Sequence, residues 1–263
     1  RVLRLLEVGE PPFAGVAADQ VRDELGGRPV MVTYCSVCRT GRVFDPTVKG
    51  SLENFRLVGM DHFNAMFEDS GTGSWWQQST GKAISGPLKG TSLAEIESIQ
   101  VTLGKFFSLY PFGKVMQAEE ASKPAYDSLG RFEKGRSRSA LTRTDSLSWK
   151  DKSWVIGITI GNRSRAYDWR KLGTLRVIND SLGSTPVVVV ISRDGQSFAA
   201  FERASPGQVF TVRNDTLVSD TLKLDFLGRD FRGVQQLRRV RAYQEFWHSW
   251  KTFHPETDTL SLH

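Results

Sequence analysis

The sequence predicts a mainly β protein with a few short helices, an α+β fold, built as two tandem pseudo-repeats of one β-rich unit. Composition supports the first part: the 263 residues include 24 Gly, 16 Phe and 7 Trp. Aromatic residues favour strands, and Gly supplies turns with positive φ. An internal match supports the second part, because LGGRPVMV at 25–32 returns as LGSTPVVV 157 residues further along. Such self-similarity, with further matches in the same order, is typical of a repeated structural unit.

The repeat divides the chain into three parts. Residues 1–118 form the first repeat, 119–152 a polar linker rich in Ser, Arg, Lys and Gly, and 153–263 a second, degenerate repeat that lacks cysteine. Apolar residues at 39% and charged residues at 24% are an ordinary globular balance. We therefore expect a buried core.

Each repeat predicts strands in the same order. A buried strand follows a turn that carries Gly and Pro, because Pro suits a strand start, where no ladder donor is needed. These buried strands are expected at 29–34 and 186–191. Shorter strands with alternating polarity are expected next, at 42–44, 54–58, 198–201 and 209–212.

Helices and one further hairpin complete the predicted fold. An amphipathic helix closes each repeat, near 102–110 and 242–253, and Pro111 and Pro255 stop these helices. In the second repeat, strands at 154–161 and 164–167 predict a hairpin that turns at 162–163.

The net charge of +6 and the pI near 9.4 come from clustered basic residues, at 131–143 and 228–243. Such clusters attract phosphates or anionic lipid headgroups. Acidic residues interrupt both runs and neither carries aromatics spaced for base stacking, so we expect no nucleic-acid partner. Contact with an anionic lipid surface stays open.

The location follows from two further observations. No stretch approaches the roughly 18 to 20 apolar residues that cross a bilayer. The chain begins at Arg1 rather than Met, so we expect an upstream segment that exports or anchors the protein. The expected location is extracytoplasmic (periplasmic) or membrane-associated, with a membrane protein complex as a candidate partner and a cytoplasmic location left open.

The only two cysteines, Cys35 and Cys38, form a Cys-x-x-Cys motif at the end of an apolar run. The second repeat has Ser192 and Gly195 at the corresponding positions, so the thiols are an addition to the fold. The pair can be a redox dithiol, a chelate for a soft metal, or a disulfide. A zinc knuckle needs a second cysteine or histidine pair, and a c-type haem needs His where Arg39 stands.

A second group of candidate residues lies at 57–81. On an extended strand, His62, Asn64, Met66 and Glu68 would share one face. Thiolate, imidazole and thioether together suit copper, which predicts Cys35, Cys38 and His62 as ligands and Met66 as a weak fourth. The residues expected to contact these ligands and orient them are Arg39, Asn64, Glu68 and Asp69. The alternative is a hydrogen-bonded structural His and a Met that fills the core.

Trp75 and Trp76 are a candidate binding surface. Neighbouring residues of a strand face opposite sides, so one ring packs and the other is expected to be exposed. An exposed Trp can stack on a sugar or a partner, although a Trp at the edge of a core explains the pair as well.

Two motifs resemble those of a known family. They are Thr-Tyr-Cys-x-x-Cys with a following Gly, at 33–38 and Gly41, and Ser-x-Trp-x-Gln-x-x-Gly-x-Ala-Ile-x-Gly-Pro at 74–87. On these motifs the chain resembles the bacterial family of unknown function called DUF3179. The resemblance covers most of the chain and implies no reaction, but it implies that members can carry an N-terminal signal or membrane segment.

These observations predict an extracytoplasmic or membrane-associated protein that binds a soft metal, copper first, with zinc or no metal as alternatives. Its role would be electron transfer, metal handling or service as an accessory subunit of a membrane complex. Two other functions stay open. One is a structural or interaction subunit with a Cys35–Cys38 disulfide, and the other is a thiol oxidoreductase. Whether the protein is an enzyme is not predicted.

Overall fold

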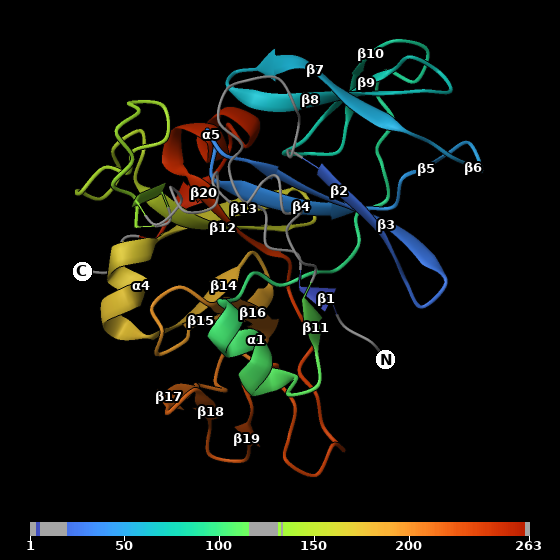
Figure 1. Cartoon of the computed structure of the whole chain (residues 1–263). Helices are drawn as coiled ribbons and strands as arrows, with labels where there is room; N and C mark the ends of the chain where they lie inside the picture. Colours follow the sequence, from blue (N-terminus) through green and yellow to red (C-terminus); the bar gives the residue numbers. More distant parts are fainter. Residues whose placement is uncertain (1–3, 6–19, 116–130, 133, 261–263) are drawn as a thin grey trace. The chain divides into compact units, whose positions relative to one another are not determined.

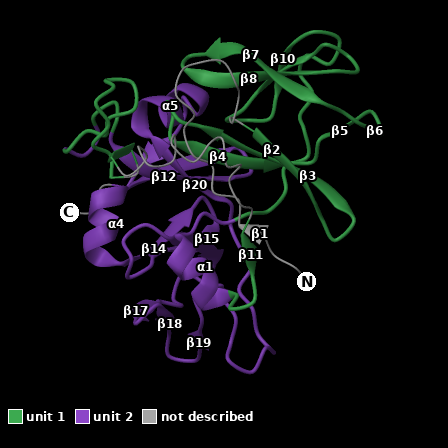
Figure 2. Ribbon diagram, in the orientation of Figure 1, with its two compact units in different colours: residues 1–98, 110–146, 150–152 green, residues 99–109, 147–149, 153–263 purple. Residues whose placement is uncertain are grey.

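A computed structural model describes residues 4–5, 20–115, 131–132 and 134–260. The fold is mainly β, and the described part adds three short helices (Figure 1), so the predicted fold class is confirmed. The chain forms two compact units (Figure 2). Unit 1 comprises residues 1–98, 110–146 and 150–152, and unit 2 comprises residues 99–109, 147–149 and 153–263.

Unit 1 begins with an antiparallel three-stranded meander in the order β2-β3-β4. Its strands are β2 Gln20–Leu25, β3 Arg28–Cys35 and β4 Thr40–Phe44. A two-residue turn at Gly26 and Gly27 joins the first two strands, and both residues have positive φ, at 62° and 82°. Glycine adopts this conformation without steric cost, which is why such turns favour it.

A four-stranded antiparallel sheet in the order β10-β9-β8-β7 completes the main part of unit 1. Its strands are β7 Phe55–Asp61, β8 Asn64–Asp69, β9 Trp75–Gln77 and β10 Ala83–Ser85. Side chains from the meander and from this sheet share one apolar cluster, which contains Cys35, Cys38, Ala65, Phe67 and Trp76. Two short pairs add to unit 1: β5 Thr47–Val48 with β6 Ser51–Leu52, and β1 Arg4–Leu5 with β11 Lys114–Val115.

Unit 2 has a meander of its own, in the order β14-β15-β16. Its strands are β14 Val177–Leu182, β15 Thr185–Ile191 and β16 Phe198–Glu202. Strand β15 is almost wholly buried, as expected for its run of β-branched residues. A small sheet follows, made of β17 Thr211–Arg213, β18 Thr216–Val218 and β19 Lys223–Leu224.

The largest sheet of unit 2 runs in the order β20-β12-β13-β21. Its strands are β12 Trp154–Ile160, β13 Arg163–Asp168, β20 Ala242–Phe246 and β21 Asp258–Thr259. The predicted hairpin is therefore present, but the turn lies at Gly161 and Asn162, one residue before the predicted position. Gly161 takes the positive φ of 60° that a tight turn needs.

The helices are α1 Leu103–Leu109, α4 Trp169–Leu175 and α5 Trp247–Phe253. The helix predicted at 242–253 is wrong in its first half, because Ala242–Phe246 pairs with β12 as a strand. Helix α1, predicted to close the first repeat, belongs to unit 2. Helix α4 was not predicted. Within the described residues, no helix combines the length and the apolar character needed to cross a membrane.

The two meanders correspond strand by strand, 157 residues apart. Asp23 pairs with Val30 in unit 1, and Asp180 pairs with Val187 in unit 2. This match concerns the meanders only, and the duplication of the whole chain stays a prediction. Of the predicted linker, residues 131–146 and 150–152 belong to unit 1, and residues 119–130 lie outside the described residues.

Candidate functional site

The two thiols lie in the turn between β3 and β4. Cys35 ends β3, and Thr40, five residues later, begins β4. The turn closes when the backbone N–H of Arg39 donates to the carbonyl oxygen of Cys35 at 2.7 Å. Arg39 has a φ of 60°, a left-handed conformation that costs energy for any residue with a Cβ. Cys35 and Cys38 are 2% and 0% exposed and form no disulfide.

The surroundings of Cys35 favour its thiolate. A hydrogen bond from the Cys38 side chain is the largest influence and lowers the pKa of Cys35 below its ordinary value of 9.0. Burial opposes this change, while backbone N–H groups of Cys38, Ala65 and Val37 support it. The thiolate is the form that binds metals and attacks disulfides, so the turn prepares Cys35 for either chemistry.

A backbone carbonyl faces both sulfurs from the β7–β8 hairpin. The carbonyl oxygen of Phe63 lies 3.2 Å from Cys38 Sγ and 3.5 Å from Cys35 Sγ. Phe63 and the preceding His62 form the hairpin turn with φ of 69° and 47°. Two-residue turns of this kind usually carry Asn and Gly, so a His-Phe pair here holds backbone strain of the sort that gathers at functional sites.

A buried polar network holds the hairpin against the thiol turn. The Asn64 amide donates to Gln78 Oε1 at 2.9 Å, and the Ser79 N–H donates to Asn64 Oδ1 at 2.9 Å. The Gln78 amide then donates to Thr33 Oγ1 and to the Thr40 carbonyl oxygen, both at 3.1 Å. Thr40 opposes Cys35 in the β3–β4 ladder. The network therefore fixes the Phe63 carbonyl, one residue before Asn64, relative to the sulfurs.

The side chain of Arg39 makes structural contacts instead of supporting a metal ligand. Its guanidinium donates to the carbonyl oxygens of Phe132 and Thr142 at 2.6 and 2.8 Å and lies over the Phe132 ring. It thus ties the thiol turn to the polar segment of unit 1. Lys152 belongs to the same unit, and burial lowers its pKa, while Asp145 and Cys38 are among the groups that favour its charged form.

The interpretation of 62–68 as one continuous strand is wrong, because the chain reverses at His62 and Phe63. The His62 side chain is 69% exposed, and its Nδ1 lies 2.7 Å from Asp61 Oδ1. Ala65 and Phe67 belong to the apolar cluster of the thiols. Met66 lies between them on β8 and so points to the opposite face of the sheet.

The two predicted carboxylates serve local structure instead. Glu68 pairs with Arg56 at 2.6 Å. Asp69 is buried and accepts hydrogen bonds from Thr72 and Ser74. Asp69 ends β8, five residues and about 16 Å from Asn64. The structure therefore does not bring Glu68 or Asp69 to the thiols.

Trp75 and Trp76 differ in exposure, as expected for neighbouring residues of a strand. Trp75 is 37% exposed and Trp76 is 3% exposed. The Trp75 indole N–H donates to Glu68 Oε2 and that of Trp76 to Asp69 Oδ2, each at 2.8 Å. Trp76 is part of the core of unit 1, which leaves Trp75 as the candidate for surface contacts.

Of the predicted site residues, Cys35 and Cys38 lie together in one turn, and Asn64 is linked to β3 and β4 through Gln78. Among the described residues, no group of three or more His, Cys, Asp or Glu side chains is placed to hold a metal ion. Sequence reasoning missed the Phe63 carbonyl and Gln78. No side-chain pattern signals a backbone carbonyl, whereas Gln78 stands in the Trp-Trp-Gln-Gln stretch and could have been considered.

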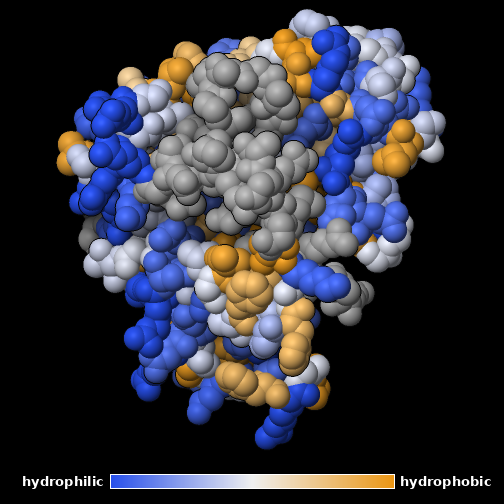
Figure 3. All heavy atoms as spheres, viewed as in Figure 1, coloured by the Kyte–Doolittle hydropathy of each residue, from blue (hydrophilic) through white to orange (hydrophobic). Residues whose placement is uncertain are grey.

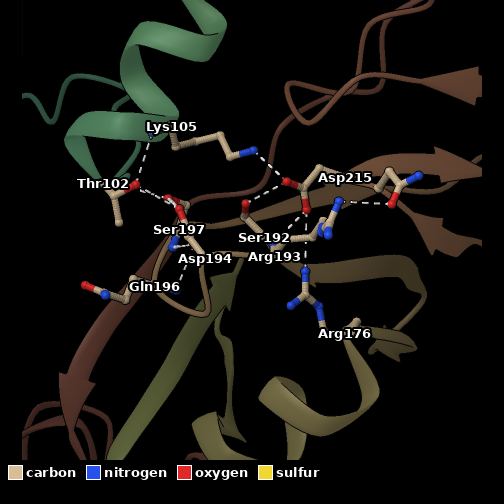
Figure 4. A network of polar contacts seen from close by, with 10 residues as sticks. Thr102, Lys105, Arg176, Ser192, Arg193, Asp194, Gln196, Ser197 and Asp215 are labelled. Atoms are coloured by element: carbon tan, nitrogen blue, oxygen red, sulfur yellow. Dashed lines mark hydrogen bonds and ion pairs between the residues drawn. The ribbon is translucent and has the colours of Figure 1, made fainter.

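In unit 2, the turn after β15 contacts the β17–β18 hairpin through charged and polar groups (Figure 4). The β17–β18 hairpin also turns through two residues with positive φ, Asn214 and Asp215. Asp215 accepts from Ser192 Oγ at 2.9 Å and from the Arg193 N–H at 2.7 Å. It also pairs with Lys105 Nζ at 2.6 Å. Burial works against ionisation, but the hydrogen bonds from Lys105, Arg193 and Ser192 hold the pKa of Asp215 below its usual value.

Fold and site together define a β-rich protein with a buried dithiol turn that favours a thiolate. A family model described as a protein of unknown function, DUF3179, matches residues 17–257. The chain belongs to this family. No curated protein and no solved structure matches it.

Proposed function

We propose that the protein binds a soft metal ion, Cu(I) first, through the thiolates of Cys35 and Cys38. The carbonyl oxygen of Phe63 is the third donor. One observation carries the proposal: both sulfurs converge on this oxygen, at 3.5 and 3.2 Å. A tetrahedral centre with bonds of about 2.0 to 2.3 Å keeps neighbouring ligand atoms about 3.5 Å apart. The two sulfur-to-oxygen distances are therefore close to the spacing of neighbouring ligands around a metal.

The identity of the donors favours copper over zinc. Thiolates select soft ions such as Cu(I), and a backbone oxygen serves as a weak, long ligand in some copper sites. A structural zinc site takes four protein ligands, more than the described residues around this turn supply. The lowered pKa of Cys35 adds support, because a metal must displace the thiol proton. Electron transfer, metal handling and service as a subunit of a membrane complex are the roles that we propose.

His62 is left out of the ligand set in this proposal. Its ring is largely exposed and lies beside Asp61, whereas the next residue contributes its backbone oxygen. The proposed ligands are therefore two side chains and one peptide group.

Metal loading tests the proposal directly. The reduced full chain is incubated with Cu(I) without oxygen, and bound copper and thiolate-to-copper absorbance are measured after desalting. We expect one ion per chain in the wild type, loss of binding in Cys35→Ser and in Cys38→Ser, and unchanged loading in His62→Ala. Ser192→Ala is the matched control, because Ser192 holds the position of Cys35 in unit 2. Equal loading of the wild type and Cys35→Ser rules the site out.

A second candidate is a thiol oxidoreductase, which the lowered pKa of Cys35 and its hydrogen bond to Cys38 favour. The Cys35 thiolate would attack a substrate disulfide, and Cys38 would resolve the mixed disulfide, leaving a reduced substrate and a Cys35–Cys38 disulfide. The burial of both sulfurs opposes this chemistry, because a partner disulfide must reach them. Intact mass after treatment with oxidised glutathione decides: rapid loss of two hydrogens favours the oxidoreductase, and no reaction favours the metal site.

The same mass measurement on the protein from its native compartment tests the structural alternative. A Cys35–Cys38 disulfide present at isolation, together with failure to bind copper after reduction, would favour a structural or interaction subunit.

A further inference from the structure

A pre-formed loop at residues 229–236 of unit 2, the Phe231 loop, ends in two exposed apolar side chains. A bridge between Arg229 and Gln236 closes its base. Above it, the Asp230 N–H donates to the Gln235 carbonyl oxygen at 2.9 Å, and the Gly233 N–H donates to the Asp230 carbonyl oxygen at 3.0 Å. The Val234 N–H donates to Asp230 Oδ1 at 2.8 Å. The backbone of the loop is thus fixed by its own hydrogen bonds.

This fixed backbone holds Phe231 and Val234 out in solvent, at 72% and 80% exposed. Single exposed apolar residues are ordinary on a protein surface. Here two stand within one four-residue turn, on a backbone that cannot fold them inward without breaking its hydrogen bonds. Little conformational entropy is therefore lost when these two side chains enter an apolar environment.

The loop and the residues after it are strongly basic. Between 228 and 241 the chain has five arginines, Arg229, Arg232, Arg238, Arg239 and Arg241, and a single acidic residue, Asp230. Of these arginines, Arg238 pairs with Glu202 outside the loop. The Asp230 carboxylate is turned back into the loop, where it accepts from Val234 N–H. The outward charge of the loop is therefore positive next to its apolar tip.

We propose that the Phe231 loop docks this protein on an anionic bilayer surface. Phe231 and Val234 enter the boundary between headgroups and acyl chains, and Arg229 and Arg232 contact headgroup phosphates. Apolar insertion combined with arginine contacts is the physical pattern of interfacial membrane binding. A single-stranded nucleic acid would need several aromatic platforms. A second copy of the same loop would bring like charges together.

The surface contains a second apolar area, which permits a control. Figure 3 shows hydrophobic side chains gathered over and beside α1, where Leu103 and Phe107 are exposed. Phe112, just after this helix in the chain, is 99% exposed and lies outside the Phe231 loop. A substitution at Phe112 therefore removes an exposed ring without touching the loop.

Vesicle co-sedimentation of the full chain tests the proposal. Vesicles of phosphatidylcholine are compared with and without phosphatidylserine. We expect binding only with phosphatidylserine, weakened about tenfold or more by Phe231→Ser with Val234→Ser, and about fivefold by Arg232→Gln. The matched controls Phe112→Ser and Arg138→Gln, the latter in the other basic cluster, should bind as the wild type does.

Three outcomes would overturn the assignment. One is equal binding to both vesicle types, and another is an equal loss in the control variants. The third is a change of oligomeric state in the loop variants, measured by sedimentation velocity, without a change in vesicle binding, because the loop would then be a protein contact. Copper loading should be the same in every loop variant, so failure of this proposal is distinct from failure of the metal site.

Discussion

In each unit the turn after the second meander strand contacts the tip of a later hairpin, β7–β8 in unit 1 and β17–β18 in unit 2, but the two contacts are made of different chemistry. In unit 1 the Cys35 and Cys38 sulfurs face the carbonyl oxygen of Phe63. In unit 2 Ser192 and Arg193 face the carboxylate of Asp215, which Lys105 and Arg176 also pair with. The fold therefore makes this contact without thiols, and the cysteines of unit 1 are available for chemistry.

The two contacts differ in how they respond to metal ions, oxidation and pH. The Asp215 carboxylate stays ionised across the physiological pH range, since its pKa lies below its usual value. The contact in unit 1 can change when a metal replaces the thiol protons, when the sulfurs oxidise, or when Cys35 ionises. Under the proposed function, a ligand or redox change alters the contact in unit 1, whereas the ionic contact in unit 2 stays the same. The predictions below test that contrast, beginning with the largest expected effect.

Removal of the Asp215 carboxylate should destabilise unit 2 most. Asp215→Ala leaves Lys105 and Arg176 partly buried without their anionic partner, and we expect the free energy of unfolding to fall by about 3 kcal/mol. Chemical denaturation followed by hydrogen exchange of unit 2 peptides measures the loss. The exposed Asp220→Ala is the matched control and should change stability by less than about 0.5 kcal/mol.

A double variant separates an ion-pair effect from simple loss of packing. Asp215→Leu combined with Lys105→Met replaces both charges by apolar side chains, and should recover part of the loss. If Asp215→Ala resembles the wild type, the hairpin tip does not depend on the network, and the proposed contrast between the units fails.

The strands predicted at 29–34 and 186–191 are correct because their signals are local. Pro29 and Pro186 stand near strand starts, and apolar runs follow them. The hairpin tip at His62 and Phe63 could not be predicted, since tertiary contacts hold a His-Phe pair where local preference asks for Asn and Gly. Because the sequence does not indicate this turn, Met66 and Glu68 were expected on the same strand face as His62. Proximity of Cys35 and Cys38 followed from spacing, but their third neighbour is a peptide oxygen that sequence patterns do not mark.

Copper should protect unit 1 alone. At a free Cu(I) concentration one hundred times the dissociation constant, binding to the native state adds about 2.7 kcal/mol to the free energy of opening. We expect slower hydrogen exchange in peptides from β3, β4, β7 and β8, and no change in those from β15 to β18. Cys35→Ser should abolish this protection. Equal protection of both units would show that copper binds elsewhere.

Two substitutions at the hairpin tip of unit 1 should stabilise the protein. His62→Asn with Phe63→Gly gives the turn the residues that its positive φ angles favour, and should raise the free energy of unfolding by about 1 kcal/mol. Copper loading should stay the same, because the proposed donor is the Phe63 backbone oxygen. The corresponding variant of unit 2, Asn214→Gly, serves as control and should gain less, since Asn already tolerates this conformation.

Loss of copper from the His62→Asn, Phe63→Gly variant would contradict the proposed ligand set. His62→Asn alone would then show whether the imidazole binds the metal, as the sequence first suggested.

The smallest effect is the pH dependence of the two contacts, which should appear at opposite ends of the scale. The pKa of Cys35 is lowered by its hydrogen bond with Cys38, so between that pKa and the ordinary value of 9.0 the unfolded chain binds more protons than the folded one. Stability should therefore rise with pH over this interval in the metal-free wild type, and the rise should be absent in Cys35→Ser.

For Asp215, the stabilisation is present above its ordinary pKa of 3.8 and is lost as pH falls through the lower folded value. Thiolate absorbance and acid unfolding measure the two limbs. A Cys38→Ala variant that titrates like the wild type would show that the neighbouring thiol does not stabilise the Cys35 thiolate, which would leave the backbone N–H groups as its support.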